Sequence, residues 1–251
     1  MNQDREHKPL PLRVALLGKG GAGKSVIAGT LCRQLARRGH AVLALDVDTV
    51  PGLSISLGAP IDAGRLPSGL AELVESKEGR RWKVVKGAGP VALVSRYAVP
   101  AADGIQYLQL GKLPGRVEPS VTIAFRHVME GFRRPGWIIV ADLAAGTRQA
   151  MFGWARFAAV RIVVVEPSAK SIISGRRLLV EGTHLLVNKV RSAAEIEIVK
   201  DAIALPLVGA IPYDEDVTMG EQQGTAPIEF APQSPAVEAI GDLARRLENG
   251  I

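Results

Sequence analysis

The stretch LGKGGAGKS, residues 17–25, decides how the rest of the chain is interpreted. It follows RVALL, residues 13–17, an apolar run with the length of a buried strand. It precedes Ile27, Leu31 and Leu35, which recur at the spacing of one helix face. The stretch therefore connects a strand to the N-terminus of a helix, and its pattern G-x-x-x-x-G-K-[ST] predicts a loop that binds phosphate groups.

The loop has the residue types that phosphate binding needs. Glycines let the backbone adopt positive φ and turn N–H groups toward an anion, and the helix adds unpaired amides and its positive dipole end. We expect the charge of Lys24 to act on the β- and γ-phosphates and the hydroxyl of Ser25 to ligate Mg²⁺. The predicted binding residues of the loop are Gly18, Gly20, Gly21, Ala22, Gly23, Lys24, Ser25 and Val26.

Length and composition favour one globular domain. The chain has 251 residues, 47% hydrophobic and 22% charged, which is typical of folded proteins and not of disordered ones. We predict a flexible lead-in over residues 1–11 and a single domain over residues 12–251. No apolar run reaches the ~18 residues of a membrane helix, and no signal peptide is visible. The single cysteine, Cys32, is expected to be a buried structural thiol in a cytoplasmic protein.

The charge balance is weakly basic. A net charge of +6 would suit an acidic partner such as DNA. The basic residues are scattered in short pairs, however, which favours solvated surface over a dedicated polyanion site. DNA therefore remains an alternative partner that is not favoured.

Apolar and amphipathic runs alternate along the chain. We predict strands at 13–17, 41–45, 137–142, 161–165, 184–187 and 207–211, with weaker ones at 83–85 and 91–94. Helices are expected after Ser25 as far as Arg38, and at 69–76, 120–132, 169–180, 193–203 and 235–247. Residues 49–68 are expected to be a loop with a short helical turn at 54–57, and residues 98–119 a long functional loop. The pattern predicts an α/β fold whose mostly parallel central sheet has helices on both faces.

Polar residues follow several of the predicted strands. They are Asp46, Asp48, Asp142 and Asn188, and Gly18 lies at the end of the first strand. Ligands of such sheets bind at the carboxyl ends of the strands. We predict that Ser25, Asp48 and Asp142 hold Mg²⁺, the carboxylates through water, and that Asp48 positions the attacking water. Asp46 is a further candidate for the metal shell. The alternative for Asp46 and Asp48 is that each caps a turn.

Two further strand ends complete the candidate site. Asn188-Lys189 could present an amide to the edge of a base, and Ile211-Pro212-Tyr213-Asp214 could form a wall of the same pocket.

These motifs together resemble a known family. KGGAGKS, residues 19–25, resembles the deviant Walker A motif of the MinD/ParA ATPases, a group that includes the nitrogenase iron protein and the CooC-type nickel-insertion ATPases of carbon monoxide dehydrogenase. The resemblance extends to residues 42–48, 142–146, 187–189 and 211–214, spans roughly residues 12–218, and is greatest to the CooC branch.

The resemblance implies a role for each matching residue. Lys19 would reach the phosphates held by the partner subunit of an ATP-bound homodimer, comparable in role to an arginine finger. Asp48 would be the hydrolytic aspartate of a first switch, and Asp142 to Gly146 a second switch. The implied catalytic residues are Lys19, Lys24, Asp48 and Asp142, and the implied adenine contacts are Asn188, Lys189, Pro212 and Asp214. The implied function is a Mg²⁺-dependent ATPase switch that acts on a protein client, by analogy in metalloenzyme maturation.

The chain departs from the family in two places. The Asp-Pro that usually follows the second strand is replaced by Asp48-Thr49-Val50-Pro51. Residues 112–127, where the CooC branch would have its metal-binding cysteines, contain Ser120 and His127 but no thiol. We therefore expect no thiolate metal site shared by a dimer. The histidines show no ligand-like spacing either.

Alternative functions stay open at this point. One is a ParA-type positioning ATPase that binds DNA non-specifically as the ATP dimer. Another is a regulator that binds nucleotide without hydrolysing it, because its first switch is altered. A membrane-bound MinD-type protein is disfavoured, since the polar side of the last helix carries Glu238, Asp242 and Glu248 where a membrane-surface helix prefers lysine and arginine.

Overall fold

The computed structural model describes residues 12–48, 52–76, 79–111, 118–146 and 153–251, so the expected lead-in over 1–11 lies outside the described residues. Its main feature is an eight-stranded sheet in the order β10-β9-β8-β1-β7-β2-β6-β5. Every neighbouring pair is parallel except β5 and β6. The strands are β1 Arg13–Gly18, β2 Ala41–Asp46, β5 Val99–Pro100, β6 Gln106–Gln109, β7 Trp137–Asp142, β8 Val160–Val165, β9 Thr183–Val190 and β10 Leu207–Pro212. The predicted mostly parallel sheet is confirmed.

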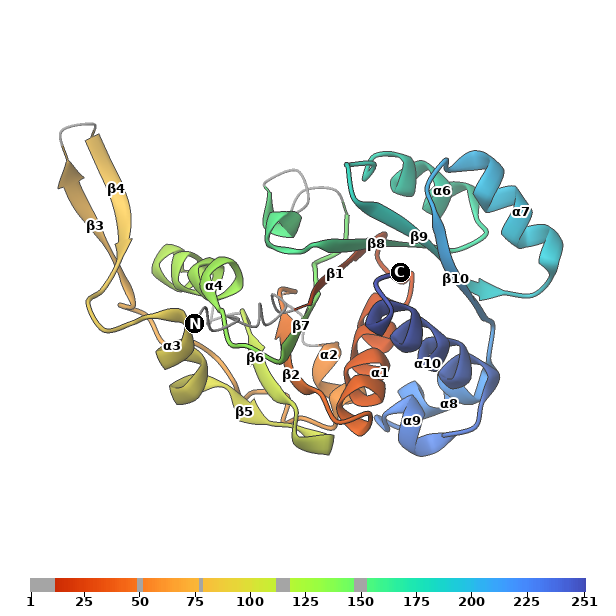
Figure 1. The fold of residues 1–251 in the computed structure, drawn as a ribbon, viewed down its shortest axis with the longest axis horizontal. Coiled ribbons are helices and arrows are strands. Elements are labelled where there is room, and N and C mark those ends of the chain that lie inside the picture. Colours follow the sequence, from red (N-terminus) through yellow and green to blue (C-terminus); the bar gives the residue numbers. More distant parts are fainter. Residues whose placement is uncertain (1–11, 49–51, 77–78, 112–117, 147–152) are drawn as a thin grey trace, which may run out of the picture.

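Helices cover both faces of the sheet (Figure 1). Successive strand residues point to opposite faces, so Val14 and Leu16 of β1 belong to one core cluster while Ala15 and Leu17 belong to the other. The first cluster packs against α1 Lys24–Arg37, α2 Leu53–Leu57 and α10 Pro235–Glu248. The second packs against α3 Pro90–Tyr97, α4 Pro119–Gly131, α6 Ala169–Arg176 and α7 Ala193–Ala202.

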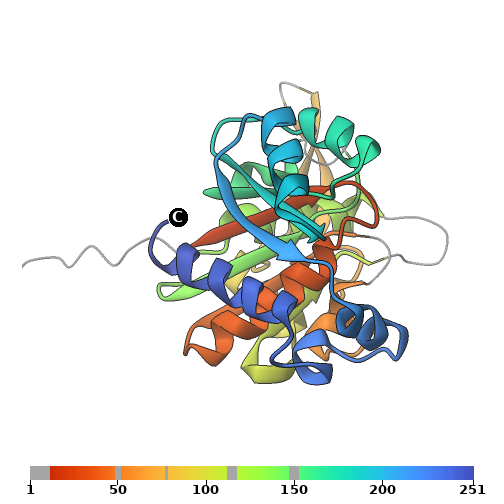
Figure 2. The same cartoon turned by 90° about the vertical axis from the view of Figure 1, so that its right-hand side faces the viewer.

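Two short helices lie between β10 and α10. They are α8 Glu215–Gln222 and α9 Pro227–Phe230, and the sequence patterns did not predict them. Figure 2 shows both beside the end of α1, where they extend the layer formed by α1 and α10. Among the described residues, no helix is both long and apolar enough to cross a membrane.

An antiparallel hairpin lies outside the central sheet. It is formed by β3 Ala71–Ser76 and β4 Gly79–Val84, and it projects from the body of the protein beside α4 (Figure 1). The predicted helix over 69–76 is therefore wrong. Leu70, Leu73 and Val74 have helical spacing, but Leu73 pairs with Trp82 across the hairpin. The weak strand predicted at 83–85 overlaps the end of β4.

Two other predictions in this part of the chain need correction. The strand predicted at 91–94 is the middle of α3, because Pro90 occupies its first turn and Leu93 and Val94 turn together into the core. Residues 98–119 are not one long loop, since β6 pairs with β2 and buries Tyr107 and Leu108. The helical turn predicted at 54–57 is confirmed as α2, and α6 ends at Arg176, earlier than expected.

Candidate functional site

The loop between β1 and α1 has the backbone geometry that its glycines allow. Gly18, Gly21 and Gly23 have φ values of 148°, 80° and 88°. A Cβ at Gly18 would lie 2.5 Å from the carbonyl oxygen of Val164, and one at Gly23 would overlap the side-chain amide of Asn188. Gly20 has no positive φ, so three of the four loop glycines use this freedom. The loop is fixed by close neighbours on both sides.

The N-terminus of α1 faces this loop. Gly23 occupies the N-cap position without a side-chain hydrogen bond to the first turn. The amides and the positive dipole end of the helix therefore remain available to an anion. Lys24 is buried, and its Nζ donates to the carbonyl oxygen of Lys19 at 3.4 Å, so the lysine bends back over the loop. This arrangement suits a phosphate group.

Asp142, at the end of β7, lies against the loop. The hydroxyl of Ser25 donates to its Oδ2 at 2.5 Å. Burial raises the pKa of Asp142 to about 6, against the opposing effects of the Ser25 hydrogen bond and the Lys24 charge. Its other oxygen, Oδ1, is buried without a hydrogen-bond partner. Buried polar atoms are normally satisfied, and a water bound to Mg²⁺ would satisfy this one. Ser25 and Asp142 therefore fit a magnesium ion.

Asp46 has a different environment from the one expected. It is fully buried, accepts from the backbone N of Asp48 at 3.0 Å through Oδ1, and accepts from the hydroxyl of Tyr107 at 3.3 Å through Oδ2. Burial, with the nearby charge of Asp142 second, raises the pKa of Asp46 to about 8. This shift favours the protonated carboxyl at neutral pH, and a part for Asp46 in the metal shell stays a prediction. Its Oδ1 fixes the backbone at Asp48 through the hydrogen bond from that residue's N–H.

The two predicted switch segments lie on either side of the loop. Asp48 follows β2 at a partly exposed position, while Thr49, Val50 and Pro51 lie outside the described residues. The chain returns at Gly52, where a Cβ would lie 3.0 Å from the hydroxyl oxygen of Ser25. On the other side, the backbone N of Gly146 donates to the carbonyl oxygen of Gly18 at 3.1 Å. Both segments therefore contact the loop.

Lys19 and Lys189 share one carboxylate that the sequence patterns did not single out. Glu166 follows β8, and its Oε1 lies 2.7 Å from Nζ of Lys189 while its Oε2 lies 3.9 Å from Nζ of Lys19. Lys189 also donates to the carbonyl oxygen of Gly21 at 2.8 Å. Because Glu166 is a polar residue directly after a buried strand, the rule that selected Asp142 would have found it.

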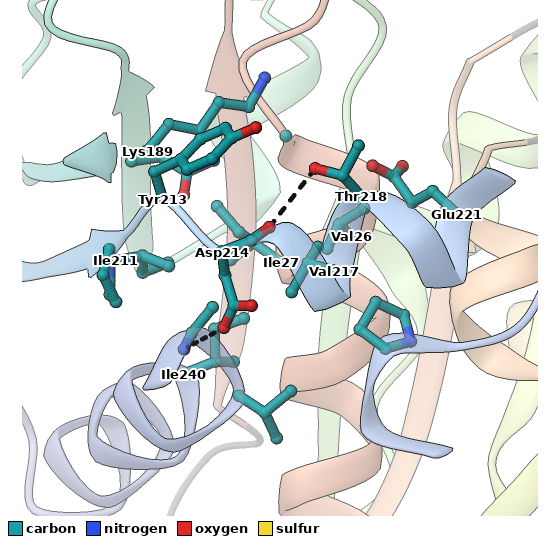
Figure 3. A pocket seen from close by; sticks show the side chains of 16 residues that line it. Val26, Ile27, Lys189, Ile211, Tyr213, Asp214, Val217, Thr218, Glu221 and Ile240 are labelled. Atoms are coloured by element: carbon teal, nitrogen blue, oxygen red, sulfur yellow. Dashed lines mark hydrogen bonds between the residues drawn. The ribbon is translucent and has the colours of Figure 1, made fainter. Parts of the chain in front are cut away.

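The ends of β9 and β10 form a pocket beside the loop (Figure 3). Asn188 is buried and its Nδ2 donates to the carbonyl oxygen of Ala22 at 2.8 Å, which joins β9 to the loop. Lys189 adopts a φ of 60°, unusual for a residue with a side chain, at a register irregularity between β9 and β10. The pocket's lining includes the predicted residues Gly23, Val26, Asn188, Lys189, Pro212 and Asp214.

Asp214 contributes to this pocket by fixing the helices around it. Its Oδ1 accepts from the backbone N of Asp216 at 3.0 Å and caps α8, and its Oδ2 accepts from the backbone N of Ala236 at 3.1 Å. Figure 3 shows the second bond, together with the hydroxyl of Thr218 donating to the backbone oxygen of Asp214. Asp214 thus ties α8 and α10 together around the pocket.

Glu221 of α8 is a pocket residue that the sequence patterns missed. It is exposed to solvent on one side, and desolvation by its neighbours in the pocket raises its pKa against the opposing charge of Lys189. Figure 3 shows it beside Thr218 on the α8 side of the pocket. Because α8 itself was not predicted, no helix face was available from which to select it. Glu221 and Asp214 are two carboxyl groups in the lining of a pocket that is otherwise largely apolar.

Cysteine and histidine contribute no metal centre in the described part of the chain. No group of three or more His, Cys, Asp or Glu side chains there could hold a metal ion. Cys32 is fully buried, and burial raises the pKa of its thiol, which confirms it as a structural residue. His40 lies 2.7 Å from Oε1 of Glu248 through Nε2.

Known proteins similar to this chain include nucleotide-binding proteins. Residues 14–228 match the family model described as the CobQ/CobB/MinD/ParA nucleotide binding domain. An uncharacterized ATP-binding protein of Methanocaldococcus jannaschii is 26% identical, over 95% of this chain and 99% of its own. The carbon monoxide dehydrogenase accessory protein CooC of Rhodospirillum rubrum is 27% identical, over 88% of this chain and 91% of its own.

A solved structure shares the fold. The septum site-determining protein MinD of Pyrococcus horikoshii, in complex with Mg-ADP, superposes with a TM-score of 0.69 at 18% identity, over 95% of this chain and 96% of its own. The family model covers most of the chain, and the strand order places the glycine loop at the sheet edge where such folds bind their ligand. The chain therefore belongs to the CobQ/CobB/MinD/ParA family of nucleotide-binding domains, as a MinD/ParA-type P-loop protein with CooC among its relatives.

Proposed function

We propose that this protein is a Mg²⁺-dependent ATPase that acts as a nucleotide-driven switch on a protein partner. The observation that supports it most directly is the hydrogen bond from Ser25 to the buried Asp142, next to the buried Lys24. A phosphate-binding cation, a metal-binding hydroxyl and a carboxylate with one unpartnered oxygen thus meet at one helix N-terminus.

Each residue of the site has a definite task in this proposal. Lys24 and the amides of the loop bind the phosphates, and Ser25 with Asp142 holds the metal, the carboxylate acting through water. Bound Mg²⁺ would neutralise charge on the β- and γ-phosphates. Asp48, whose backbone N is held by the carboxyl of Asp46, orients the attacking water and accepts its proton.

The nucleoside is assigned to the pocket beside the loop. Asn188 reaches the loop at one end of the pocket, and the apolar side chains of Val26, Val217 and Ile240 give a surface on which a flat base can lie. Asp214 keeps α8 and α10 in place around it. Adenine is the base we assign, because the relatives include a protein named for ATP binding.

Lys19 supports a homodimer with ATP at its interface. In the single chain its side chain is 36% exposed and its nearest carboxylate, Glu166, is 3.9 Å away. A weak surface pair of this kind is easily exchanged for a phosphate. Lys19 can therefore leave Glu166 and stabilise charge on the nucleotide of a facing subunit, as the family resemblance implies.

The proposed client is a protein, and metalloenzyme maturation in the cytoplasm is the pathway suggested by the CooC relative. Two other functions make distinct predictions. A ParA-type positioning ATPase, favoured by the net charge of +6, would bind DNA only with ATP and would release it steeply as salt rises. A non-hydrolysing regulator would bind ATP without multiple turnover.

The deciding experiment compares ATP hydrolysis by the wild type, Lys24→Ala and Asp48→Ala at saturating ATP and Mg²⁺. Both variants should lose roughly 100-fold or more in turnover, because each removes a group that acts on the transition state. Lys170→Ala, an exposed lysine of α6, is the matched control and should keep wild-type turnover. Equal turnover in all four proteins would refute the ATPase.

A further inference from the structure

A second cavity lies on the opposite face of the sheet from α1. Its walls come from the 3₁₀-helix η2 Trp154–Phe157 and from the connection between α6 and β9, residues 177–182. Leu17, Ala155 and Leu178, which line it, belong to the core cluster that packs against α6 and α7. Its volume is about 530 Å³, within the roughly 300 to 1,000 Å³ of small-molecule sites. The described part of its lining shares no residue with the pocket beside the loop.

Three arginines that line this cavity have no carboxylate partner. Arg161 of β8 is half-buried, and it donates from Nε to the carbonyl oxygen of Ala155 at 3.0 Å and from Nη1 to that of Glu181 at 2.8 Å. These bonds join the two walls and leave its Nη2 without a hydrogen-bond partner among the described residues. Arg156 and Arg177 are exposed, and their guanidinium groups make no ion pair or hydrogen bond within the described chain. The cavity therefore gathers three cations that the fold does not neutralise.

Two glycines leave room for the guanidinium groups. Gly153 precedes η2 and Gly182 precedes β9, and their φ values are 77° and 73°. A Cβ at Gly153 would lie 3.1 Å from Nε of Arg156, and a Cβ at Gly182 would lie 3.2 Å from Nη1 of Arg161. Either side chain would press against an arginine from a backbone conformation that favours glycine. Both walls are thus shaped around the arginines.

The chemistry of the lining favours a phosphate group. Like charges gathered in one cavity repel one another, so a bound anion would stabilise them. Guanidinium groups bind phosphate oxygens in pairs, and three of them suit a dianion with several acceptor oxygens better than a single carboxylate. Glu181 is the acidic residue of the described lining, and its one charge leaves the three arginines in excess. Leu17, Leu178 and Val180 add apolar surface for the rest of a ligand.

We infer that this cavity binds the phosphate group of a small phosphomonoester, with an apolar part of the molecule against Leu17 and Leu178. The inference does not depend on the proposed ATPase, because the nucleotide pocket lies beside α1 on the other face of the sheet. A DNA duplex fits less well. Its phosphates could meet the exposed Arg156 and Arg177, but Arg161 is half-buried and the two leucines are each 2% exposed, so a ligand that uses all of them must enter the cavity.

The test titrates the full chain with phenyl phosphate by calorimetry at low salt, and the wild type should bind it. Arg156→Gln with Arg177→Gln should weaken this binding about tenfold or more, because two charge-assisted contacts are lost. Arg81→Gln with Arg246→Gln, exposed on β4 and α10, removes the same charge and should bind like the wild type. Lys24→Ala should also bind like the wild type, which separates this cavity from the phosphate loop.

Each other outcome overturns the inference. No binding by the wild type, or equal binding by the cavity variant and the charge control, would mean that the arginines form no site. Loss of binding in Lys24→Ala would place the probe in the phosphate loop. Benzoate bound as tightly as phenyl phosphate would show that the cavity does not select phosphate. A DNA duplex that displaces phenyl phosphate and needs the same two arginines would assign the surface to nucleic acid.

Two further measurements make the result unambiguous. Thermal unfolding verifies that each variant is folded, which is expected because Arg156 and Arg177 are exposed. ATP turnover is measured on the same wild-type protein. Absence of turnover would refute the ATPase and leave the phenyl phosphate result as it stands, so the two proposals fail separately.

Discussion

The carboxyl edge of the central sheet and the β3–β4 hairpin use charged residues in opposite ways. At the sheet edge Lys24 and Asp142 are buried, and each has a defined neighbour within the loop or the strands. On the hairpin Arg81 and Lys83 are exposed, on the face opposite Trp82. Buried charges tolerate few arrangements, because any unpaired one is costly. Single substitutions at the nucleotide edge should therefore have large effects on nucleotide binding and turnover. Substitutions on the hairpin should leave both unchanged.

The largest effect is expected from Gly23→Ala. Its new Cβ would overlap the amide of Asn188 at a φ of 88°, so both the loop and its link to β9 must move. We expect loss of ATP binding by about 100-fold, measured by titration with a fluorescent ATP analogue. Gly21→Ala is the matched control, because its φ of 80° brings the same backbone strain, about 1 to 2 kcal/mol, with no atom within 4 Å. Equal losses in the two variants would show that the clash with Asn188 is unimportant.

Asp142→Asn should come next. The amide oxygen can still accept from Ser25, so the fold is kept while the carboxylate that faces the metal water is lost. The apparent Mg²⁺ affinity, from the Mg²⁺ dependence of ATP turnover, should fall about 10- to 100-fold. Asp201→Asn, an exposed residue of α7, should leave it unchanged. An unaltered Mg²⁺ dependence in Asp142→Asn would remove Asp142 from the metal site.

Asp46→Asn should show through the pH dependence of stability that the carboxyl of Asp46 is neutral. The pKa of Asp46 is raised to about 8 in the folded protein, so the folded state holds its proton where the unfolded state has lost it. This group therefore contributes destabilisation that grows as pH rises from about 4 to about 8. The variant lacks the ionisation, so its free energy of unfolding relative to wild type should increase across that window by about 1.4 kcal/mol per pH unit, or roughly 5 kcal/mol in all. Urea unfolding at several pH values measures it, and a pH-independent difference would show that Asp46 is ionised.

The smallest effect is expected from Trp82→Ala. Because the ring is 40% exposed on a hairpin outside the sheet, its removal should cost less than about 1 kcal/mol and leave ATP turnover unchanged. Trp137→Ala is the contrasting variant, since that ring packs edge-on against Phe132 with centroids 5.6 Å apart. It should cost roughly 2 kcal/mol in thermal unfolding. If Trp82→Ala were the more damaging, the hairpin would belong to the core and the contrast between the two regions would fail.

Local patterns predicted the nucleotide edge well and the hairpin region badly. At the edge, apolar runs such as 137–142 and 161–165 are long, and polar residues mark where they end, so the strands and their order of appearance were clear. In residues 69–109 the apolar residues fit two periods. Leu73 and Val74 suit a helix but lie in β3, while Leu93 and Val94 suit a strand but lie in α3. Pairing with distant residues decided these cases.

The residues of the candidate site divide in the same way, into those that local patterns identify and those that they do not. Asp142, Ser25 and Lys24 could be selected from the chain, because a strand end and a glycine loop each have a local pattern. The protonated state of Asp46 could not, since it depends on burial under β6 and on Tyr107, which come from a segment that had been predicted as loop. Glu166 follows a predicted strand and could have been selected, but its ion pairs with Lys19 and Lys189 appear only where the ends of β1, β8 and β9 come together.

The sequence by itself determined the phosphate loop, the alternation of strands and helices, and the family, because these depend on residues close together in the chain. Only the tertiary structure decided which carboxylate accepts from Ser25, which one has its pKa raised to about 8, and that Lys19 and Lys189 share Glu166. It also decided that Leu73 and Trp82 stand in solvent as a pair. Burial and pairing are properties of residues brought together from distant parts of the chain, and no local pattern encodes them.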